Sequence, residues 1–238
     1  MLDKEQKLLA RVLDLFAQRF DQKAVLRGGM VLRVLGSPRL TNDLDYVFVP
    51  YTSKKEIVDD VLVCLHSIDG AHIEHSLNSK CLRVVLTVDG TRIQVESTVA
   101  VDVESDTAST RMFSQQFDLP PRLIHIMELS VALSNKLAAW NERRLIRDLY
   151  DVWFLLQMSV TPNHATLAER LKSPNYSPLV DSDDYYAGDS LPDFYDFIRA
   201  KVATYTDDDI HDGLSDYLTD EEIAGLLLQF KAALARLR

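Results

Sequence analysis

The sequence is poor in cysteine and has no long apolar run. Its two cysteines, Cys64 and Cys81, lie in apolar surroundings, so a disulfide framework is not expected. No stretch approaches the roughly 20 apolar residues that a membrane-spanning helix needs. The first residues mix charges into an amphipathic pattern where a signal peptide would have an apolar centre. We therefore expect a cytoplasmic protein with no membrane partner.

Basic residues are outnumbered, which argues at first against a nucleic-acid partner. The 238 residues carry a net charge of −10, from 26 Lys and Arg against 36 Asp and Glu. However, 14 acidic residues and only two basic ones fall between Asp181 and Glu222, which leaves 24 basic and 22 acidic residues elsewhere. An acidic segment of this kind is typical of a solvated face. A local phosphate-binding site in the rest of the chain is therefore allowed.

Apolar periodicity and turn-forming residues predict an α+β protein. A mixed sheet with helices is expected over residues 1–115 and an all-helical half over 116–238, which would complete a cleft. In the first half we expect helices at 2–19, 30–35 and 54–66, a strand at 43–50, and strands over 72–98 that are broken at 78–79 and 89–90. Asp89-Gly90 between alternating apolar residues is a strong hairpin signal.

The second half is predicted from where proline and glycine are missing. No glycine or proline occurs from Arg122 to Val160, which predicts two helices with a break near 141–147. A loop-rich stretch is expected over 162–192. Helices are expected over 193–204 and 219–237, the second opened by the capping-box pair Thr219 and Glu222.

Three carboxylates are candidate metal ligands. The two-residue period of a strand places Asp43 and Asp45 on one face and Leu44 on the other. A cation would relieve the repulsion between the aspartates, and Mg²⁺ prefers such oxygen ligands. Glu96 ends another predicted strand and could complete a cluster that holds two cations around a transferring phosphoryl or nucleotidyl group. Taken alone, each carboxylate has a simpler interpretation: it is a polar residue on the solvent-facing side of a strand.

Glycines and cations provide candidate phosphate contacts. Gly28-Gly29 precede a short predicted helix, where backbone N–H groups can approach an anion closely. Lys136, Arg143 and Arg147 are spaced seven and four apart within an otherwise apolar stretch. Cations beside a core helix suggest phosphate neighbours. The simpler alternatives are that the glycines form a turn at the start of a helix and that the cations lie on a salt-bridged surface helix.

Two motifs together resemble a known family. "RGGMVLRVLGSPRLTNDLDYVF" resembles the GG(S/T)…R-x-(S/T)-x-D-h-D signature of the AbiEii group of bacterial nucleotidyltransferase toxins, which belong to the DNA polymerase β superfamily. "KLAAWNERRLIRDLYD" is similar to the second signature of that group, K-h-x-A-x-x-x-R-x-x-x-R-D-x-x-D. The resemblance runs from about residue 5 to residue 160.

This resemblance implies roles for matching residues. Gly28, Gly29 and the following Met30 would hold the phosphates of a nucleoside triphosphate, with Arg39 in its expected place. Asp43, Asp45 and Glu96 would bind magnesium, with two ions expected, and activate the acceptor hydroxyl. Lys136 would contact the triphosphate, and Asp148 occupies the second acidic position of the family. The nucleotide-binding set is thus Gly28, Gly29, Met30, Arg39, Lys136, Arg143 and Arg147.

The resemblance also implies partners, and two positions depart from it. Relatives modify tRNA 3′ ends or protein side chains and are paired with an antitoxin from a neighbouring gene. Met30 replaces the usual Ser or Thr, and Glu96 replaces the frequent Asp. We expect a Mg²⁺-dependent nucleotidyltransferase toxin with tRNA favoured as acceptor. A small-molecule nucleotidyltransferase and a non-catalytic binding protein that retains the fold are the alternatives.

Overall fold

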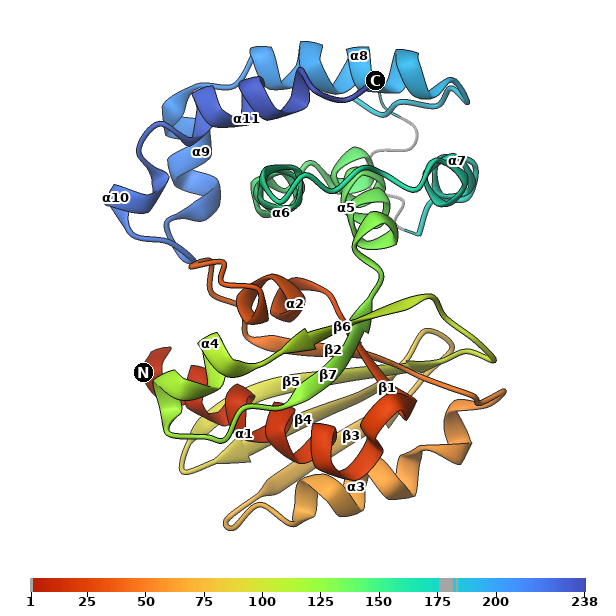
Figure 1. Cartoon of the computed structure of the whole chain (residues 1–238), viewed down its shortest axis with the longest axis vertical. Helices are drawn as coiled ribbons and strands as arrows, with labels where there is room; N and C mark the ends of the chain where they lie inside the picture. Colours follow the sequence, from red (N-terminus) through yellow and green to blue (C-terminus); the bar gives the residue numbers. More distant parts are fainter. Residues whose placement is uncertain (1, 176–181, 183) are drawn as a thin grey trace. The chain divides into compact units, whose positions relative to one another are not determined.

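The chain forms two compact units in the computed structural model, which describes residues 2–175, 182 and 184–238. The first unit spans Met1–Glu128 and the second Leu129–Arg238 (Figure 1). The division follows the last strand of the sheet, and therefore comes after Glu128 instead of after residue 115. Asp181 and Asp183 of the predicted acidic segment lie outside the described residues.

The first unit is built on a mixed seven-stranded sheet with the order β3-β4-β5-β2-β1-β7-β6. Its strands are β1 (Ala24–Arg27), β2 (Asp43–Phe48), β3 (His72–Leu77), β4 (Leu82–Val88), β5 (Thr91–Val99), β6 (Ser105–Ser109) and β7 (Leu123–Met127). Strand β2 is parallel to β5 and antiparallel to β1. Its helical segments are α1 (Leu2–Phe20), η1 (Asp21–Lys23), α2 (Gly29–Val34), η2 (Lys54–Glu56), α3 (Val58–His66), α4 (Arg111–Ser114) and η3 (Gln115–Phe117).

The central strand β2 has one apolar face and one polar face, as predicted. Leu44, Tyr46 and Phe48 are buried. The ring of Tyr46 lies 5.0 Å from that of Phe16 on α1, measured between centroids. Helix α1 therefore covers the face of β2 opposite to the aspartates (Figure 1). The half-buried side chains of Asp43 and Asp45 occupy the other face.

The second unit is helical and is closed by its own apolar core. It contains α5 (Leu129–Arg143), α6 (Ile146–Gln157), α7 (His164–Lys172), α8 (Leu191–Ala203), α9 (Asp207–Leu214), α10 (Asp220–Ile223) and α11 (Leu226–Leu234). Buried Leu137, Trp140 and Phe230 belong to this core. The predicted break between two helices is confirmed at Arg144, whose φ is 54°. The capping box of Thr219 and Glu222 is also confirmed.

Several predicted elements differ from the structure. The helix predicted from Arg122 is wrong at its start, because Leu123–Met127 forms strand β7 between β1 and β6. Ile124 and Ile126 alternate with more exposed neighbours, and this two-residue period prevails over the lack of glycine and proline. Helix α7 lies within the stretch predicted to be loop-rich. The predicted helix over 219–237 is divided at Gly225, whose φ is 77°.

Candidate active site

The three candidate carboxylates lie on neighbouring strands of one sheet face. Asp45 pairs in register with Glu96 across the parallel strands β2 and β5, and Asp43 pairs with Gln94. Residues in register point to the same side of a sheet, and adjacent strands are about 4.8 Å apart. Arg27 on β1 is in turn the antiparallel partner of Asp45. The carboxylates therefore form part of a polar row that crosses the sheet.

Asp43 is oriented by a threonine from the preceding loop. The Thr41 hydroxyl donates a hydrogen bond to Asp43 Oδ1 at 2.6 Å. Thr41 is buried, and its carbonyl oxygen accepts a hydrogen bond of 2.7 Å from Gln6 Nε2 on α1. The loop that delivers Asp43 is thus anchored to the helix behind the sheet, which fixes the direction of this carboxylate.

The glycine pair makes room for two side chains of the site. Gly28 has a φ of 76°, and a Cβ atom there would lie 2.3 Å from Asp45 Oδ2. A Cβ atom on Gly29 would lie 2.7 Å from Nη2 of Arg39. At Gly28 the positive φ and the close approach of Asp45 both favour glycine, and at Gly29 a side chain would displace the Arg39 guanidinium. The sequence interpretation did not include this reason.

Two residues of the predicted phosphate-binding set are buried. The Met30 side chain is 0% exposed and belongs to the core, so only its backbone could meet a phosphate. Arg39 is 5% exposed, and its Nη1 donates to the Leu40 carbonyl at 3.1 Å. Both residues support the loop around the glycines in this structure. A contact between the Arg39 guanidinium and a nucleotide stays a prediction.

Glu96 is held by two neighbours on its own sheet face. Its Oε1 atom lies 2.8 Å from Arg83 Nη2 and accepts a hydrogen bond of 2.8 Å from Gln94 Nε2. Within the described residues, no group of three or more His, Cys, Asp or Glu side chains is assembled closely enough to hold a metal ion. The predicted convergence of three carboxylates is therefore not seen. Asp43 and Asp45 still provide the one or two protein carboxylates that Mg²⁺ usually takes, so this donor set fits the ion.

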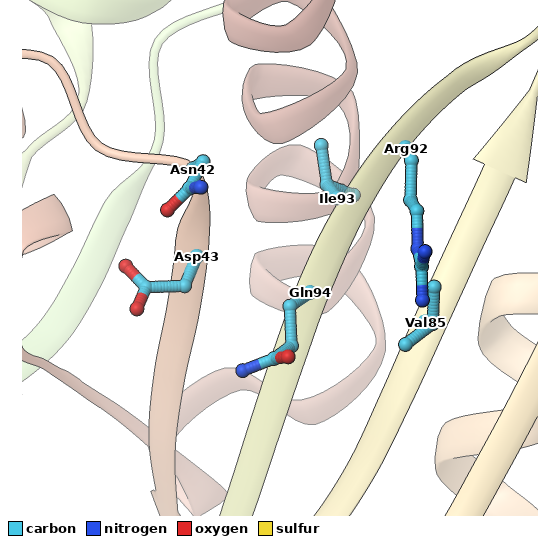
Figure 2. A pocket seen from close by; sticks show the side chains of 6 residues that line it. All are labelled: Asn42, Asp43, Val85, Arg92, Ile93 and Gln94. Carbon is cyan, nitrogen blue, oxygen red and sulfur yellow. The ribbon is translucent and has the colours of Figure 1, made fainter. Parts of the chain in front are cut away.

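A small pocket opens beside Asp43. It has a volume of about 240 Å³ and is lined by Asn42, Asp43, Val85, Arg92, Ile93 and Gln94. Figure 2 shows Asp43 and Gln94 on neighbouring strands, with Arg92 farther along β5. The pocket offers one carboxylate, one guanidinium and two carboxamides around an apolar valine, groups that can bind a polar organic substrate.

The second unit contains a buried ion cluster built from the second motif. Asp148 and Asp151 on α6 are 0% exposed. Lys136 Nζ lies 2.6 Å from Asp151 Oδ2 and 3.6 Å from Asp148 Oδ1. Arg143 donates to both carboxylate oxygens of Asp148, at 2.6 and 2.7 Å. The motif thus joins α5 and α6 through paired charges, which buried carboxylates require.

Other cations of the two motifs have local partners. Arg147 Nη1 donates to the Tyr217 hydroxyl at 3.0 Å. The Arg147 side chain therefore contacts Tyr217 and does not join the ion cluster of Lys136. Arg144 lies over the Trp140 ring, 4.0 Å from its centroid, and burial lowers its pKa to about 10. Arg33 donates to the Ser37 carbonyl at 2.7 Å. These contacts account for all three arginines without a ligand, and the phosphate contact of Arg147 stays a prediction.

Four further polar residues of the first unit escaped sequence reasoning: Arg83, Gln94, Asn42 and Arg92. Arg83 could have been found, because the two-residue turn at Asp89-Gly90 fixes the register of β4 against β5 and pairs Arg83 with Glu96. The pocket residues depend on how β2 lies beside β5, and β2 and β5 are far apart in sequence. No local pattern predicts that neighbour relationship.

The sheet, the glycine pair and the aspartates define the nucleotidyltransferase class of fold. A profile of the family "Nucleotidyl transferase AbiEii toxin, Type IV TA system" matches residues 8–232. The chain belongs to this family of nucleotidyltransferase toxins, which confirms the resemblance seen in its motifs and implies an antitoxin partner. The comparison with curated protein sequences gave no match.

Solved structures support the same fold. JHP933 from Helicobacter pylori is 16% identical, with a TM-score of 0.56 over 97% of this chain and 90% of that one. MenT4, a nucleotidyltransferase toxin from Mycobacterium tuberculosis H37Rv, is 17% identical, with a TM-score of 0.51 over 98% of this chain and 92% of that one. At these identities the likeness concerns the fold. No helix in the described part of the chain is long and apolar enough to cross a membrane.

Proposed function

We propose that the protein transfers a nucleoside monophosphate from a nucleoside triphosphate to an acceptor hydroxyl, with Asp43 and Asp45 as ligands of Mg²⁺. The observation that carries this proposal is the placement of both aspartates on one sheet face, with Asp45 against Gly28 and in register with Glu96. When bound there, Mg²⁺ would neutralise charge on the phosphates and orient them for attack. Two ions are expected during transfer.

Residues of the first unit can accept the proton and bind the phosphates in this reaction. The acceptor oxygen forms a bond to the α-phosphorus of the triphosphate, the bond between the α-phosphorus and the bridging oxygen breaks, and pyrophosphate leaves. The hydroxyl proton passes to a carboxylate, for which Glu96 is suited because it lies beside Asp45. The backbone at Gly28 and Gly29 would receive the phosphates, since no side chain intervenes there.

We assign the second unit a role in binding the triphosphate. Lys136 is the proposed contact, because its ammonium group is held by Asp148 and Asp151 while 17% of its side chain stays exposed. Asp148 would act by positioning Arg143 and Lys136, since it is buried between them. Arg143 pairs with Asp148 and is 23% exposed, and we propose phosphate contacts for it and for Arg147.

We favour a tRNA 3′ end as the acceptor, with a protein side chain as the alternative. The support is electrostatic: outside the acidic segment, basic residues slightly outnumber acidic ones, and the exposed Arg92 lies at the pocket beside Asp43. A cognate antitoxin encoded by a neighbouring gene is the expected protein partner. A small-molecule acceptor is a further alternative, because a pocket of about 240 Å³ with polar lining residues lies beside Asp43.

Labelling with each nucleoside triphosphate tests the proposal. The purified protein is incubated with Mg²⁺, each α-³²P-labelled NTP, and either total tRNA or a tRNA-free cell lysate. Label is expected in tRNA, and binding of tRNA should weaken steeply as salt rises because phosphate contacts release counterions. Label in protein, or tRNA binding that does not change with salt, would indicate that the acceptor is a protein side chain. Absence of label with all four NTPs and both acceptor pools would contradict the transferase proposal.

A further inference from the structure

The two oxygens of the Glu96 carboxylate have different surroundings. Oε1 accepts hydrogen bonds from Arg83 Nε at 3.0 Å and from Gln94 Nε2 at 2.8 Å, and lies 2.8 Å from Arg83 Nη2. The guanidinium and the carboxamide both converge on this one atom, and neither donates to Oε2. Oε1 is therefore saturated with strong donors. The Cys81 thiol also lies beside this carboxylate, and its pKa is raised by burial, by the charge of Glu96 and by a hydrogen bond with Glu96. A thiol is only a weak donor, so Oε2 can still accept a proton or bind a cation.

The donors come from the sheet itself, so their positions are fixed by strand register. Arg83 on β4 is the antiparallel partner of Glu96, on the side away from Asp45. Gln94 precedes Glu96 by two residues on β5 and therefore shares its face. Glu96 is thus bracketed by Asp45 on one strand and by Arg83 on another, and the bond to Gln94 runs along its own strand.

We propose that Arg83 and Gln94 are positioning residues that hold Glu96 by Oε1 and present Oε2 to the acceptor side of the site. This inference rests on the proposed transferase function. A glutamate side chain has one more rotatable bond than an aspartate and is less well fixed by the backbone. Two donors to a single oxygen remove that freedom, and a charge-assisted bond from arginine is the stronger of the two. The clamp explains how glutamate can serve at this position.

A purely structural role for Arg83 is disfavoured by its exposure. The Arg83 side chain is 49% exposed and the Glu96 side chain 22%. Exposed ion pairs contribute little to stability, so removal of the guanidinium should leave the fold intact. The remaining alternative is that Arg83 contacts a substrate phosphate directly, which predicts an effect that does not depend on Glu96.

A double-mutant cycle separates these roles. Arg83→Met, Gln94→Leu and Glu96→Ala are made singly and in pairs, with Arg83→Lys as the conservative variant and exposed Arg11→Gln on α1 as a charge control. We expect Arg83→Met to lower kcat about tenfold or more with little change in KM for the NTP, and Arg83→Lys to recover part of the loss. In the Glu96→Ala background, Arg83→Met should change kcat less than about twofold, since coupled residues are not additive.

Cation binding gives a readout that does not require turnover. Mn²⁺ affinity is measured by electron paramagnetic resonance in the presence of a non-hydrolysable NTP. Arg83→Met and Glu96→Ala should each weaken Mn²⁺ binding, and the double variant should be no weaker than Glu96→Ala alone. Equal effects of Arg83→Met in both backgrounds, or a change confined to the acceptor KM, would overturn the clamp. If coupling is found in Mn²⁺ binding while the wild-type protein transfers no nucleotide, the clamp stands and the proposed function fails.

Discussion

Gly28 lies directly against Asp45, so that a Cβ atom on Gly28 would come 2.3 Å from Asp45 Oδ2. The same glycine has a φ of 76°, which side-chain-bearing residues rarely adopt. Two separate demands therefore meet at one residue: a backbone conformation and a close approach by a carboxylate. A second glycine of the unit, Gly90, has a φ of 77°, but a Cβ atom added there would meet no atom of the described residues within 4 Å. Gly90 therefore shares the positive φ of Gly28 but not its close contact with a carboxylate.

Replacing Gly28 by alanine should abolish transfer, whereas the same change at Gly90 should not. Both variants carry the strain of a positive φ, about 1 kcal/mol or more, but only Gly28→Ala displaces the Asp45 carboxylate. We expect both variants to lose unfolding free energy in urea, with the larger loss in Gly28→Ala, and a difference in turnover, measured on folded protein, of at least about a hundredfold. Equal activity of the two variants would show that the position of Asp45 is not critical.

Asp45→Ala should lower turnover by at least about a hundredfold, because charge stabilisation on a transferring phosphoryl group contributes several kcal/mol. Toxicity on expression should fall in parallel. Glu74→Gln, an exposed carboxylate on the edge strand β3, is the matched control and should remain active. Labelling of the acceptor by Asp45→Ala at the wild-type rate would place the chemistry elsewhere.

Lys136→Met should affect both folding and activity, because it removes the ammonium group that pairs with the buried carboxylate of Asp151. Removing one partner of a buried pair typically costs about 3–5 kcal/mol. The double variant Lys136→Met/Asp151→Asn should recover much of the unfolding free energy but not the activity. Urea denaturation and labelling measure the two effects.

Arg170→Met provides the control for that experiment. Arg170 pairs with buried Glu142 at 2.6 Å in the same unit, so its loss should also destabilise the fold. Its turnover, measured well below the unfolding transition, should stay near the wild-type value. If Lys136→Met/Asp151→Asn is equally active, Lys136 is a structural residue and the triphosphate contact lies elsewhere.

Cys64 should resist alkylation, because burial raises the pKa of its thiol to about 11 from an ordinary value of 9.0. At pH 8 the thiolate population is then about a hundredfold lower than in a free cysteine. Since the folded pKa is raised, the stability linked to the protonated thiol is present below about pH 9 and is lost as the pH rises through about 11. Iodoacetamide labelling of the Cys81→Ser variant, folded and in urea, measures this. Equal rates in both states would contradict the burial of Cys64.

Local signals predicted the elements that carry the site, but not their neighbours. Asp43 and Asp45 could be placed on one strand face because the two-residue period is a local property. The Arg83 partner of Glu96 follows from the hairpin turn at Asp89-Gly90, which makes it predictable in principle. The contact of Gly28 with Asp45 needs β1 to lie beside β2, which depends on tertiary packing.

The second unit shows the same division between local and long-range information. The break between α5 and α6 could be anticipated, but not that Lys136 would reach across it to Asp151. In the first unit, strand β7 escapes prediction because its short alternating pattern is outweighed by the helical stretch that follows. Its place between β1 and β6 is a long-range property of the sheet.

The polar row across the sheet has a consequence for the order in which substrates bind. Four residues follow one another in register across the sheet: Arg27, Asp45, Glu96 and Arg83. The two arginines thus flank the two carboxylates. The row itself carries no net charge, and Asp43 on the same face adds one negative charge, so a free divalent cation would leave the site with a net positive charge. A nucleoside triphosphate brings its own negative charge, and we therefore expect metal and nucleotide to enter as one complex. Calorimetry should show weak binding of Mg²⁺ alone and much tighter binding when the NTP is present; tight binding of Mg²⁺ alone would contradict this coupling.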